Sequence, residues 1–232
     1  MVTGATGAIG KAIASELIAR GVTVCAVGSK PETLAELART TGWQPDQVCY
    51  CPVDLAVEAD IAEFCSTCVQ RWPVIQMLVH CAATIELGEL SCARVEDFDR
   101  QYRINVRAPY QITQALLPRL RAAKGQIVFI NSTTGLRGKK ERGQYSATKH
   151  ALRAIADSLR EEVNQDGVRV LSVFLGRTAS RMQVAVFPSD RPYCSEKLLQ
   201  PSDVASVVVH ALEMPATAEV TDVWIRPLIK SY

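Results

Sequence analysis

The 232-residue chain has no long uninterrupted hydrophobic run. No apolar stretch approaches the roughly 18 residues that a transmembrane helix needs, so we expect no membrane span. No secretory signal peptide is visible after Met1 either. The net charge is only +2, with both signs interspersed, which argues against nucleic acid as a partner. We therefore expect neither a membrane nor a nucleic acid as a partner, and a cytoplasmic location.

The chain also lacks internal repeats, low-complexity tracts and linkers. Its length suits one large domain, and 48% of its residues are hydrophobic, so a sizeable core needs no disulfides. We therefore expect residues 1–232 to form a single domain.

The eight cysteines include two close pairs, Cys49-x-Cys51 and Cys65-x-x-Cys68. A zinc site would require such pairs to converge in tetrahedral geometry, and neither pair has the spacing of a zinc ribbon or finger. Buried cysteines commonly act as small apolar side chains in a reducing compartment. The pattern therefore predicts free thiols and no metal site.

Short apolar runs alternate with amphipathic stretches along the whole chain. The switch between a period of two and a period of about 3.6 predicts alternating strands and helices. The apolar runs carry few polar residues, as parallel strands buried on both faces do. The order predicts a doubly wound α/β fold with helices on both faces of the sheet. Strands are expected near 1–3, 22–27, 47–53, 75–80, 126–131, 168–174 and 221–225, and helices near 8–20, 31–40, 58–70, 96–122, 145–165 and 201–213.

A glycine-rich turn, Thr3-Gly-Ala-Thr-Gly-Ala-Ile-Gly10, joins the first predicted strand, which is short, to the first predicted helix. Glycines allow a tight turn, let the backbone approach a pyrophosphate, and let the helix pack closely. The helix N-terminus adds unpaired N–H groups that bind phosphate. The turn therefore predicts a dinucleotide site that includes Gly4, Thr6, Gly7, Ile9 and Gly10.

The end of the second predicted strand indicates which dinucleotide binds. A carboxylate there bonds the ribose 2′-hydroxyl and disfavours a 2′-phosphate. This chain has Ser29 and Lys30 instead, with no acidic residue. We expect Ser29 and Lys30 to bind the extra phosphate, which favours NADP(H) over NAD(H); the alternative is that Lys30 is only a solvated residue at a helix start. Asp54 and Leu55, after the third strand, are expected beside the adenine.

Ser132, Tyr145 and Lys149 form the candidate catalytic group. Ser132 follows the apolar run 126–130 and Asn131, so it lies at a strand end, where open α/β sheets bind their ligands. Tyr145 and Lys149 are four residues apart at the start of a helix, so they share a face. A free tyrosine has a pKa of about 10 and needs a decrease of roughly three units to act as an acid/base near neutrality. A nearby lysine cation favours the phenolate and supplies part of that decrease.

Together these residues resemble a short-chain dehydrogenase/reductase of the single-domain type, over nearly the whole chain. The resemblance rests on the glycine turn, Asp54-Leu55, Asn105, Ser132, Tyr145-x-x-x-Lys149 and Gly176-Arg177-Thr178. It implies a Rossmann-type three-layer sandwich with a seven-stranded parallel sheet and a nicotinamide cofactor. It also implies assembly through the helices near 96–122 and 145–165, as a homodimer or homotetramer.

The resemblance further implies an NAD(P)(H)-dependent oxidoreductase that interconverts a carbonyl and a secondary alcohol. Tyr145 would exchange the proton with the substrate oxygen, and Ser132 would hold that oxygen. Lys149 would lower the pKa of Tyr145 and bind the nicotinamide ribose, while Asn105 would support a water relay to Lys149. The cofactor pocket would also include Cys81, Ala82, Gly176 and Thr178, with Thr178 at the carboxamide.

Several positions depart from the family pattern. His80-Cys-Ala-Ala83 stands where Asn-Asn-Ala-Gly is usual, Ala8 replaces a glycine, and Leu175-Gly176 replaces Pro-Gly. These departures keep open a catalytically silent nucleotide-binding sensor or partner protein. The glycine spacing also resembles that of sugar-nucleotide epimerases and dehydratases, but those need a larger C-terminal domain, for which we expect no room after a last strand ending near 225.

Three further features border the predicted site. The segment 176–200 has no clear period, which predicts a substrate lid; the alternative is a mobile surface excursion. The run Arg137-Gly-Lys-Lys-Glu-Arg142 lies near the substrate and is either a solvated loop or an attractor of carboxylate or phosphate. His80, at a strand end, is expected to pack or hydrogen-bond rather than to act as a catalytic base.

Overall fold

The computed structural model describes residues 1–187 and 192–229. Within these residues a seven-stranded sheet has the order β3-β2-β1-β4-β5-β6-β7, and every neighbouring pair of strands is parallel. The predicted seven-stranded parallel sheet is therefore confirmed. Its strands are β1 (Val2–Thr3), β2 (Val24–Gly28), β3 (Val48–Pro52), β4 (Met77–His80), β5 (Gln126–Ser132), β6 (Arg169–Leu175) and β7 (Asp222–Ile225).

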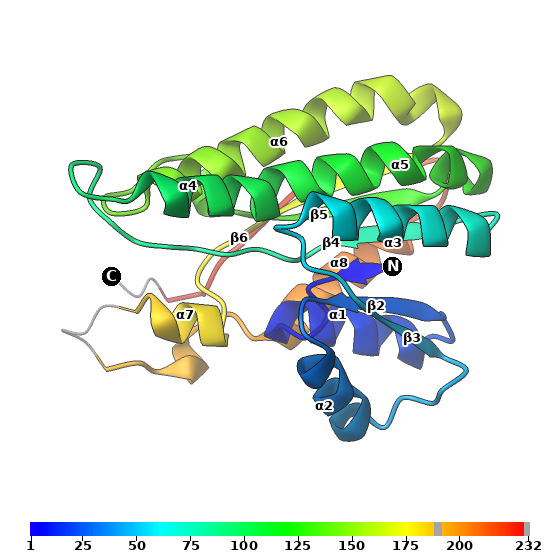
Figure 1. Cartoon of the computed structure of the whole chain (residues 1–232), viewed down its shortest axis with the longest axis horizontal. Helices are drawn as coiled ribbons and strands as arrows, with labels where there is room; N and C mark the ends of the chain where they lie inside the picture. The colour runs from blue at the N-terminus through cyan, green and yellow to red at the C-terminus, as the bar shows by residue number, and fades with distance from the viewer. Residues whose placement is uncertain (188–191, 230–232) are drawn as a thin grey trace.

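Helices cover both faces of the sheet and complete the predicted three-layer sandwich (Figure 1). On one face α1 packs against α8, and on the other α3 packs against α5 while α6 covers β5 and β6. The helices are α1 (Ala8–Ala19), α2 (Pro31–Thr41), α3 (Glu58–Arg71), α4 (Val95–Tyr102), α5 (Ala108–Ala123), α6 (Gly143–Val163), α7 (Arg181–Ala185) and α8 (Pro201–Leu212).

The central strands are buried on both faces, and β5 shows why. Successive side chains of a strand point to opposite faces. Val128 and Ile130 belong to the core cluster under α1 and α8, whereas Ile127 and Phe129 belong to the cluster under α3, α5 and α6. Apolar residues at consecutive positions therefore fill two cores at once. This is the pattern that a parallel sheet between two helical layers requires.

Local chemistry sets several helix ends. Pro31 occupies the first turn of α2, where its missing N–H costs nothing. Gly42 ends α2 in the left-handed conformation with φ of 66°, which glycine adopts without steric cost. Gln200 and Asp203 form a capping box at the start of α8, because each side chain accepts from the backbone N–H of the other.

The expected helix 96–122 is interrupted by a π-helical turn at Arg103–Arg107, between α4 and α5. A π turn holds one residue more than an α turn and often marks a functional site. Asn105 lies within this turn and is buried. The prediction of one continuous helix over 96–122 did not include this turn.

The segment 176–200 contains one short helix, α7, and a 3-10 turn at Ser195–Lys197. A five-residue helix is too short to produce a readable helical period. The two ends of the segment are joined, because Ala179 N donates to Leu199 O at 2.8 Å and Leu199 N donates to Arg177 O at 3.1 Å. Part of the predicted lid, residues 188–191, lies outside the described residues, and the lid stays a prediction.

All eight cysteines have free thiols. The Sγ atoms of Cys25 and Cys51 are 3.5 Å apart, well beyond the bond length of about 2.05 Å in a disulfide. In the described part of the chain, no group of three or more His, Cys, Asp and Glu side chains is arranged to hold a metal ion. No helix among the same residues has the length and apolar character needed to cross a bilayer.

Candidate active site

The glycine turn between β1 and α1 is closely packed. Gly4 has a φ of 66°, and a Cβ there would lie 2.7 Å from Ala82 Cα. A Cβ on Gly10 would lie 2.3 Å from the Gly4 carbonyl oxygen. Larger residues at either position would push the turn away from β4 or from α1. The backbone path that a dinucleotide phosphate requires therefore depends on both glycines.

The start of α1 offers free backbone donors. Gly7 is the N-cap residue, and among the described residues no side chain caps the helix and no acidic residue lies in its first turn. Its first N–H groups are thus available to an anion, and the helix dipole favours negative charge there. Thr6 packs over the end of β2, where a Cβ on Gly28 would lie 2.9 Å from Thr6 Cγ2. Ile9 packs against the core cluster of α1 and α8.

The ends of β2 and β3 lie beside the glycine turn. Ser29 and Lys30 directly follow β2, and both are exposed. Asp54 is exposed and accepts from Ala56 N at 2.9 Å through Oδ1, while Leu55 is buried in the core. The structure therefore places Ser29, Lys30 and Asp54 where solvent reaches them. Their predicted contacts with ribose phosphate and adenine remain predictions.

Thr3 holds the segment after β4, which the sequence predicts to border the cofactor. Its Oγ1 accepts hydrogen bonds from the backbone N–H groups of Cys81 at 3.1 Å and Ala82 at 3.3 Å. This residue was not among the sequence-predicted site residues. Its position at the end of β1, opposite the end of β4 in the sheet register, is the signal that could have identified it.

His80 is a structural residue, in agreement with the sequence-based expectation. It is buried, its ring stacks on Phe129 at a centroid distance of 5.0 Å, and its Nε2 shares a hydrogen bond with Thr113 Oγ1 at 2.8 Å. Burial, with a smaller contribution from the N-terminal amine, lowers the pKa of His80 to about 3. The imidazole is therefore neutral at physiological pH and fixed in the core.

Ser132, Tyr145 and Lys149 are brought together at the carboxyl end of β5. Ser132 is its last residue, and the first turns of α6 pack on the 3-10 turn that follows it. Lys149 Nζ donates to Ile130 O at 2.9 Å and lies 5.8 Å from the centre of the Tyr145 ring. Both Tyr145 and Lys149 are buried.

Ser132 has its hydrogen-bonding direction set by Thr134. The backbone N–H and the hydroxyl of Thr134 both donate to Ser132 Oγ, at 3.2 and 2.9 Å. A serine hydroxyl has two acceptor lone pairs and one proton. Because both lone pairs already accept hydrogen bonds, the Ser132 hydroxyl can form a further hydrogen bond only by donating its proton. It is therefore a donor, and in this structure it hydrogen-bonds with the phenol of Tyr145.

The pKa of Tyr145 is raised to about 12, chiefly because the phenol is buried. A hydrogen bond with Ser132 and the charge of Arg142 lower it in part. Burial also lowers the pKa of Lys149 to about 8. The sequence-based expectation of a Tyr145 pKa near neutrality does not hold in this structure, because desolvation disfavours both charged forms.

Asn105 joins three segments. Its Oδ1 accepts from Thr84 N at 2.8 Å, and its Nδ2 donates to Thr84 O at 2.8 Å and to Thr148 Oγ1 at 3.1 Å. The π turn, the segment after β4 and α6 are therefore fastened together one residue from Lys149. The predicted water relay from Asn105 to Lys149 remains a prediction. Thr84 and Thr148 were missed in the sequence, because Thr84 lies in no motif and Thr148 is one of the unspecified positions inside Tyr145-x-x-x-Lys149.

Gly176 and Thr178 follow the end of β6. A Cβ on Gly176 would lie 3.0 Å from Arg226 Cα, so the chain after β7 packs closely there. Thr178 is buried, and its hydroxyl donates to Gly176 O at 3.2 Å. The Ser132–Leu175 register brings this segment beside the end of β5. The structure thus gathers the segments after β1, β4, β5 and β6 at one edge of the sheet.

Residues 1–191 match a family model described as short chain dehydrogenase. The chain belongs to the short-chain dehydrogenase/reductase family. It is similar to an uncharacterised oxidoreductase of Staphylococcus aureus, with 29% identity over 98% of this chain and 96% of the relative.

Two solved structures of related proteins have the same fold. One is the closed form of a serine dehydrogenase in complex with NADP⁺, with a TM-score of 0.88 and 27% identity, covering 100% of this chain and 95% of the other. The second is a metagenomic short-chain oxidoreductase in complex with NADP, with a TM-score of 0.83 and 27% identity, covering 99% and 96%. Both comparisons span nearly the whole dehydrogenase chain.

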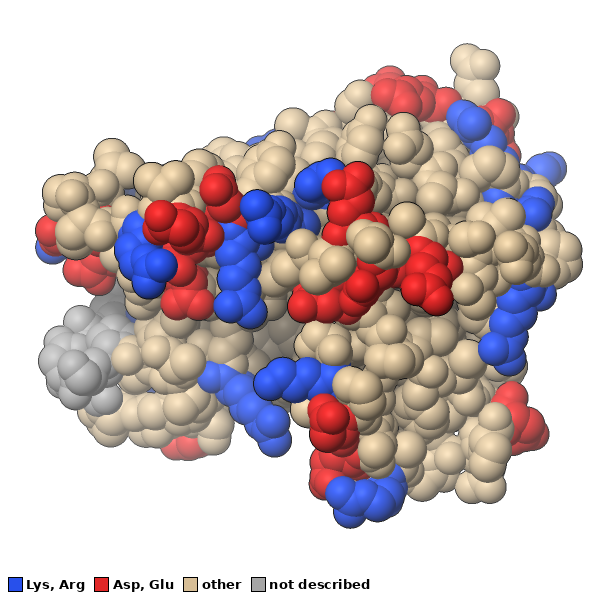
Figure 2. Space-filling model, in the orientation of Figure 1, with Lys and Arg blue, Asp and Glu red and all other residues tan. Residues whose placement is uncertain are grey.

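The surface of the molecule is hollowed at the same edge of the sheet. Figure 2 shows a central hollow between the part of the molecule that carries α4 and the part that carries α1 and α7. Lysine and arginine side chains lie on both sides of it, and acidic side chains gather in a patch at its upper right. The hollow lies at the carboxyl ends of the strands, where open α/β sheets bind ligands.

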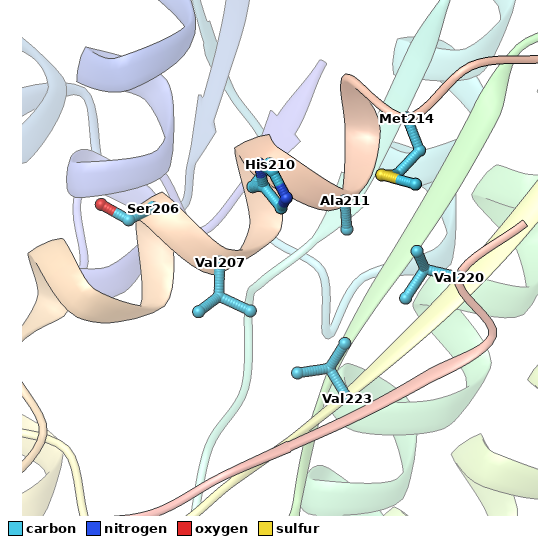
Figure 3. Close-up of a pocket in the computed structure, with 7 residues that line it drawn as sticks. All are labelled: Ser206, Val207, His210, Ala211, Met214, Val220 and Val223. Atoms are coloured by element: carbon cyan, nitrogen blue, oxygen red, sulfur yellow. The ribbon is translucent and has the colours of Figure 1, made fainter. Parts of the chain in front are cut away.

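A separate apolar groove of about 320 Å³ lies between α8 and β7 (Figure 3). Val207, Ala211 and Val223 face it, with His210 at one side. It borders the last helix and the edge strand, and none of the predicted site residues lines it. This groove is therefore distinct from the candidate active site.

Proposed function

We propose that this dehydrogenase interconverts a carbonyl and a secondary alcohol with NADP(H). The observation that carries the proposal is the position of Ser132, Tyr145 and Lys149 at the end of β5, at the same edge of the sheet as the uncapped start of α1. Ser132, with its lone pairs occupied by Thr134, donates to the reacting oxygen, and Tyr145 exchanges a proton with the same oxygen.

The residues present fit a nicotinamide dinucleotide. Gly4, Gly7 and Gly10 leave the backbone path clear for the pyrophosphate, and the free N–H groups of α1 bind it. Cys81, Ala82, Gly176 and Thr178 line the nicotinamide half, while Asp54 and Leu55 lie at the adenine half. When bound, the cofactor supplies or accepts the hydride, and the protein orients and polarises the substrate.

Two observations support NADP(H) over NAD(H). No carboxylate follows β2, where it would disfavour a 2′-phosphate, and Ser29 and Lys30 are exposed there. Two related dehydrogenases of known structure, described above, are complexes with NADP⁺ or NADP. The serine dehydrogenase among them is named for the oxidation of an alcohol, which agrees with a substrate that carries a CH–OH group.

The protonation state of Tyr145 favours carbonyl reduction, in which its phenol gives a proton to the substrate oxygen. With a pKa of about 12, the buried phenol of Tyr145 keeps its proton at neutral pH and can donate it to a carbonyl oxygen. Lys149, whose pKa is about 8, bonds the nicotinamide ribose and returns a proton to Tyr145. Asn105 supports the water chain that recharges Lys149. Oxidation of the alcohol uses the same residues in reverse.

The broader organisation follows from the same proposal. The chain works as one domain over 1–232, with the segment 176–200 as a lid over the substrate. It assembles as a homodimer or homotetramer through α4, α5 and α6. Eight free thiols suit a reducing compartment, so we place the protein in the cytoplasm.

The decisive experiment compares the wild type with Tyr145→Phe, which keeps the ring and removes the exchangeable proton. Nicotinamide fluorescence measures the dissociation constants for NADPH and NADH, and an NADPH assay with small ketones and keto acids measures turnover. We expect both proteins to bind NADPH at least tenfold more tightly than NADH, and Tyr145→Phe to lose turnover by about 10²–10⁴-fold.

The competing proposal is a catalytically silent nucleotide-binding sensor, which the unusual segment 80–83 favours. Under that proposal the wild type binds NADPH but reduces no carbonyl, and Tyr145→Phe changes nothing. Tighter binding of NADH than of NADPH would refute the cofactor preference alone.

A further inference from the structure

Asn131 is a buried polar residue in an otherwise apolar stretch of β5. It precedes Ser132 and is only 3% exposed. Alternate residues of a strand share a face, so Asn131 lies on the same face as Ile127 and Phe129, in the core under α3, α5 and α6. A buried amide destabilises a core unless its polar atoms find hydrogen-bond partners. The partners of this side chain therefore indicate what it does.

The side-chain amide of Asn131 joins the backbones of two candidate catalytic residues. Its Oδ1 accepts from Ser132 N at 2.7 Å, and its Nδ2 donates to Lys149 O at 3.2 Å. The reversed amide would place two donors together at one contact and two acceptors together at the other, so the chemistry fixes the orientation of the group. One side chain therefore links the end of β5 to α6 between Ser132 and Lys149.

Lys149 is held to β5 at both of its ends. Asn131 binds its carbonyl oxygen, and its ammonium group donates to Ile130 O at 2.9 Å. Two neighbouring residues of one strand thus fix the backbone and the head group of the lysine. Tyr145 lies about one helical turn before Lys149 in α6, so the same contacts also set the distance of Tyr145 from the end of β5.

The turn after Ser132 closes over this amide. Gly135 is buried in the 3-10 turn Thr133–Gly135, and a Cβ on it would lie 2.6 Å from Asn131 Oδ1 and 2.9 Å from Lys149 O. The turn, the amide and α6 are therefore packed against one another with no space for an additional carbon atom. Such packing holds the amide in one conformation.

We propose that Asn131 is a positioning residue, which fixes Ser132 relative to Lys149 and Tyr145 without contacting the substrate. The proposal rests on the function proposed above and adds a residue to it. In that function Ser132 and Tyr145 act on the same substrate oxygen, so their separation must be set before the substrate binds. A displacement of about 1 Å in a catalytic site can lower the rate about 10²-fold. A purely structural asparagine would affect stability and leave the rate of the folded protein unchanged.

The test compares Asn131→Ala with Thr113→Val. The second variant is the matched control, because it removes another buried hydrogen bond, that between Thr113 in α5 and His80 in β4. NADPH oxidation is measured with 2,3-butanedione and with acetoacetate, and the better substrate gives kcat and KM. We expect Asn131→Ala to lower kcat at least tenfold and to change KM less than threefold, because the reacting groups are displaced while the substrate contacts remain. Thr113→Val should change kcat less than threefold.

Gly135→Ala tests the same contact without removing the amide. Its Cβ pushes against Asn131 Oδ1, so we expect kcat to fall at least tenfold. Gly138→Ala, with nothing within 4 Å of its Cβ, should retain kcat. In the Asn131→Ala/Gly135→Ala double variant the amide no longer blocks the added Cβ. The combined loss of kcat should therefore be at least tenfold smaller than the product of the two single losses.

The proposal is overturned if Asn131→Ala or Gly135→Ala keeps kcat within threefold of the wild type, or if Thr113→Val loses as much kcat as Asn131→Ala. It is also overturned if the two single losses multiply in the double variant. If Asn131→Ala does not fold, the comparison of Gly135→Ala with Gly138→Ala decides by the same thresholds.

Failure of the proposed function is visible separately. If the wild type reduces no carbonyl, that function fails, and hydrogen exchange of the Ser132 amide, measured by NMR, decides whether Asn131 holds Ser132. Exchange at least tenfold faster in Asn131→Ala than in the wild type, with Thr113→Val unchanged, supports the positioning of Ser132 by Asn131. Unchanged exchange in Asn131→Ala, or an equal increase in Thr113→Val, overturns it.

Discussion

At the scale of single residues, Lys149 occupies an unusual environment. Its amino group is buried and donates to one carbonyl, that of Ile130. An ammonium group loses more solvation there than it regains from a single hydrogen bond, so burial lowers its pKa from 10.5 to about 8. Burial of the Lys149 ammonium group therefore destabilises the folded protein, at a position that its proposed chemistry needs.

Replacing Lys149 with Met should therefore stabilise the protein. The decrease in the pKa of Lys149 corresponds to a cost of about 3 kcal/mol for burying its charge at pH 7. Loss of the hydrogen bond to Ile130 O offsets about 1 kcal/mol of the gain from removing that charge. We expect the free energy of unfolding in urea at pH 7 to rise by about 2 kcal/mol, while turnover is lost.

The pH dependence provides the check on this prediction. Between the folded pKa of about 8 and the unfolded value of 10.5, the unfolded chain binds the proton that the folded chain has released. The free energy of unfolding of the wild type therefore rises with pH in this window relative to that of Lys149→Met. The difference in stability between the two proteins shrinks accordingly. Lys140→Met, at an exposed lysine, should change stability little. A variant that is no more stable than the wild type at pH 7 would contradict the buried-charge explanation.

At the scale of elements, the contact between the glycine turn and α1 positions the proposed phosphate site. The Gly10 backbone approaches Gly4 so closely that a Cβ would overlap its carbonyl oxygen. The start of α1 is therefore held against the end of β1, and its free N–H groups point to one place. Thr3 secures the segment after β4 on the other side of this turn through two hydrogen bonds.

Gly10→Ala should displace the start of α1 and weaken cofactor binding. Because the overlapping atom is backbone, the helix must shift, and we expect a loss of about 1–3 kcal/mol in unfolding free energy. The dissociation constant for NADPH, measured by nicotinamide fluorescence, should rise at least tenfold. Gly138→Ala is the matched control, since nothing lies within 4 Å of its added Cβ. Unchanged NADPH affinity in Gly10→Ala would mean that this contact does not shape the site.

At the scale of the whole molecule, some of the exposed apolar side chains lie on the outer helices. Val95 at the start of α4, Tyr102 at its end and Tyr110 in α5 are 68%, 46% and 50% exposed. Exposed apolar surface of this kind marks interaction sites. It supports the proposed assembly through these helices.

Light scattering after size exclusion should give a mass two or four times the 25.4 kDa of one chain. Tyr110→Glu places a charge on the face of α5 and should shift the protein toward lower mass. Gln44→Glu adds the same charge in an exposed loop before β3 and should leave the mass unchanged. A wild-type mass of one chain at micromolar concentration would exclude the assembly.

The sequence by itself determined the elements and most of the candidate site. Strand and helix order depends on local periodicity, and the glycine turn on backbone freedom that only glycine has. The spacing of Tyr145 and Lys149 places both on one helix face, whatever surrounds the helix. These features are local, so they could be read from neighbouring residues.

Only the tertiary structure decided the burial, the pKa values and the long-range contacts of these groups. The pKa of Tyr145 rises to about 12 because burial sums the desolvation from every element packed around it. Thr3, Thr84 and Thr148 enter the site through hydrogen bonds between segments far apart in the chain. Burial and contacts across the sheet depend on the packed chain, so no local pattern contains them.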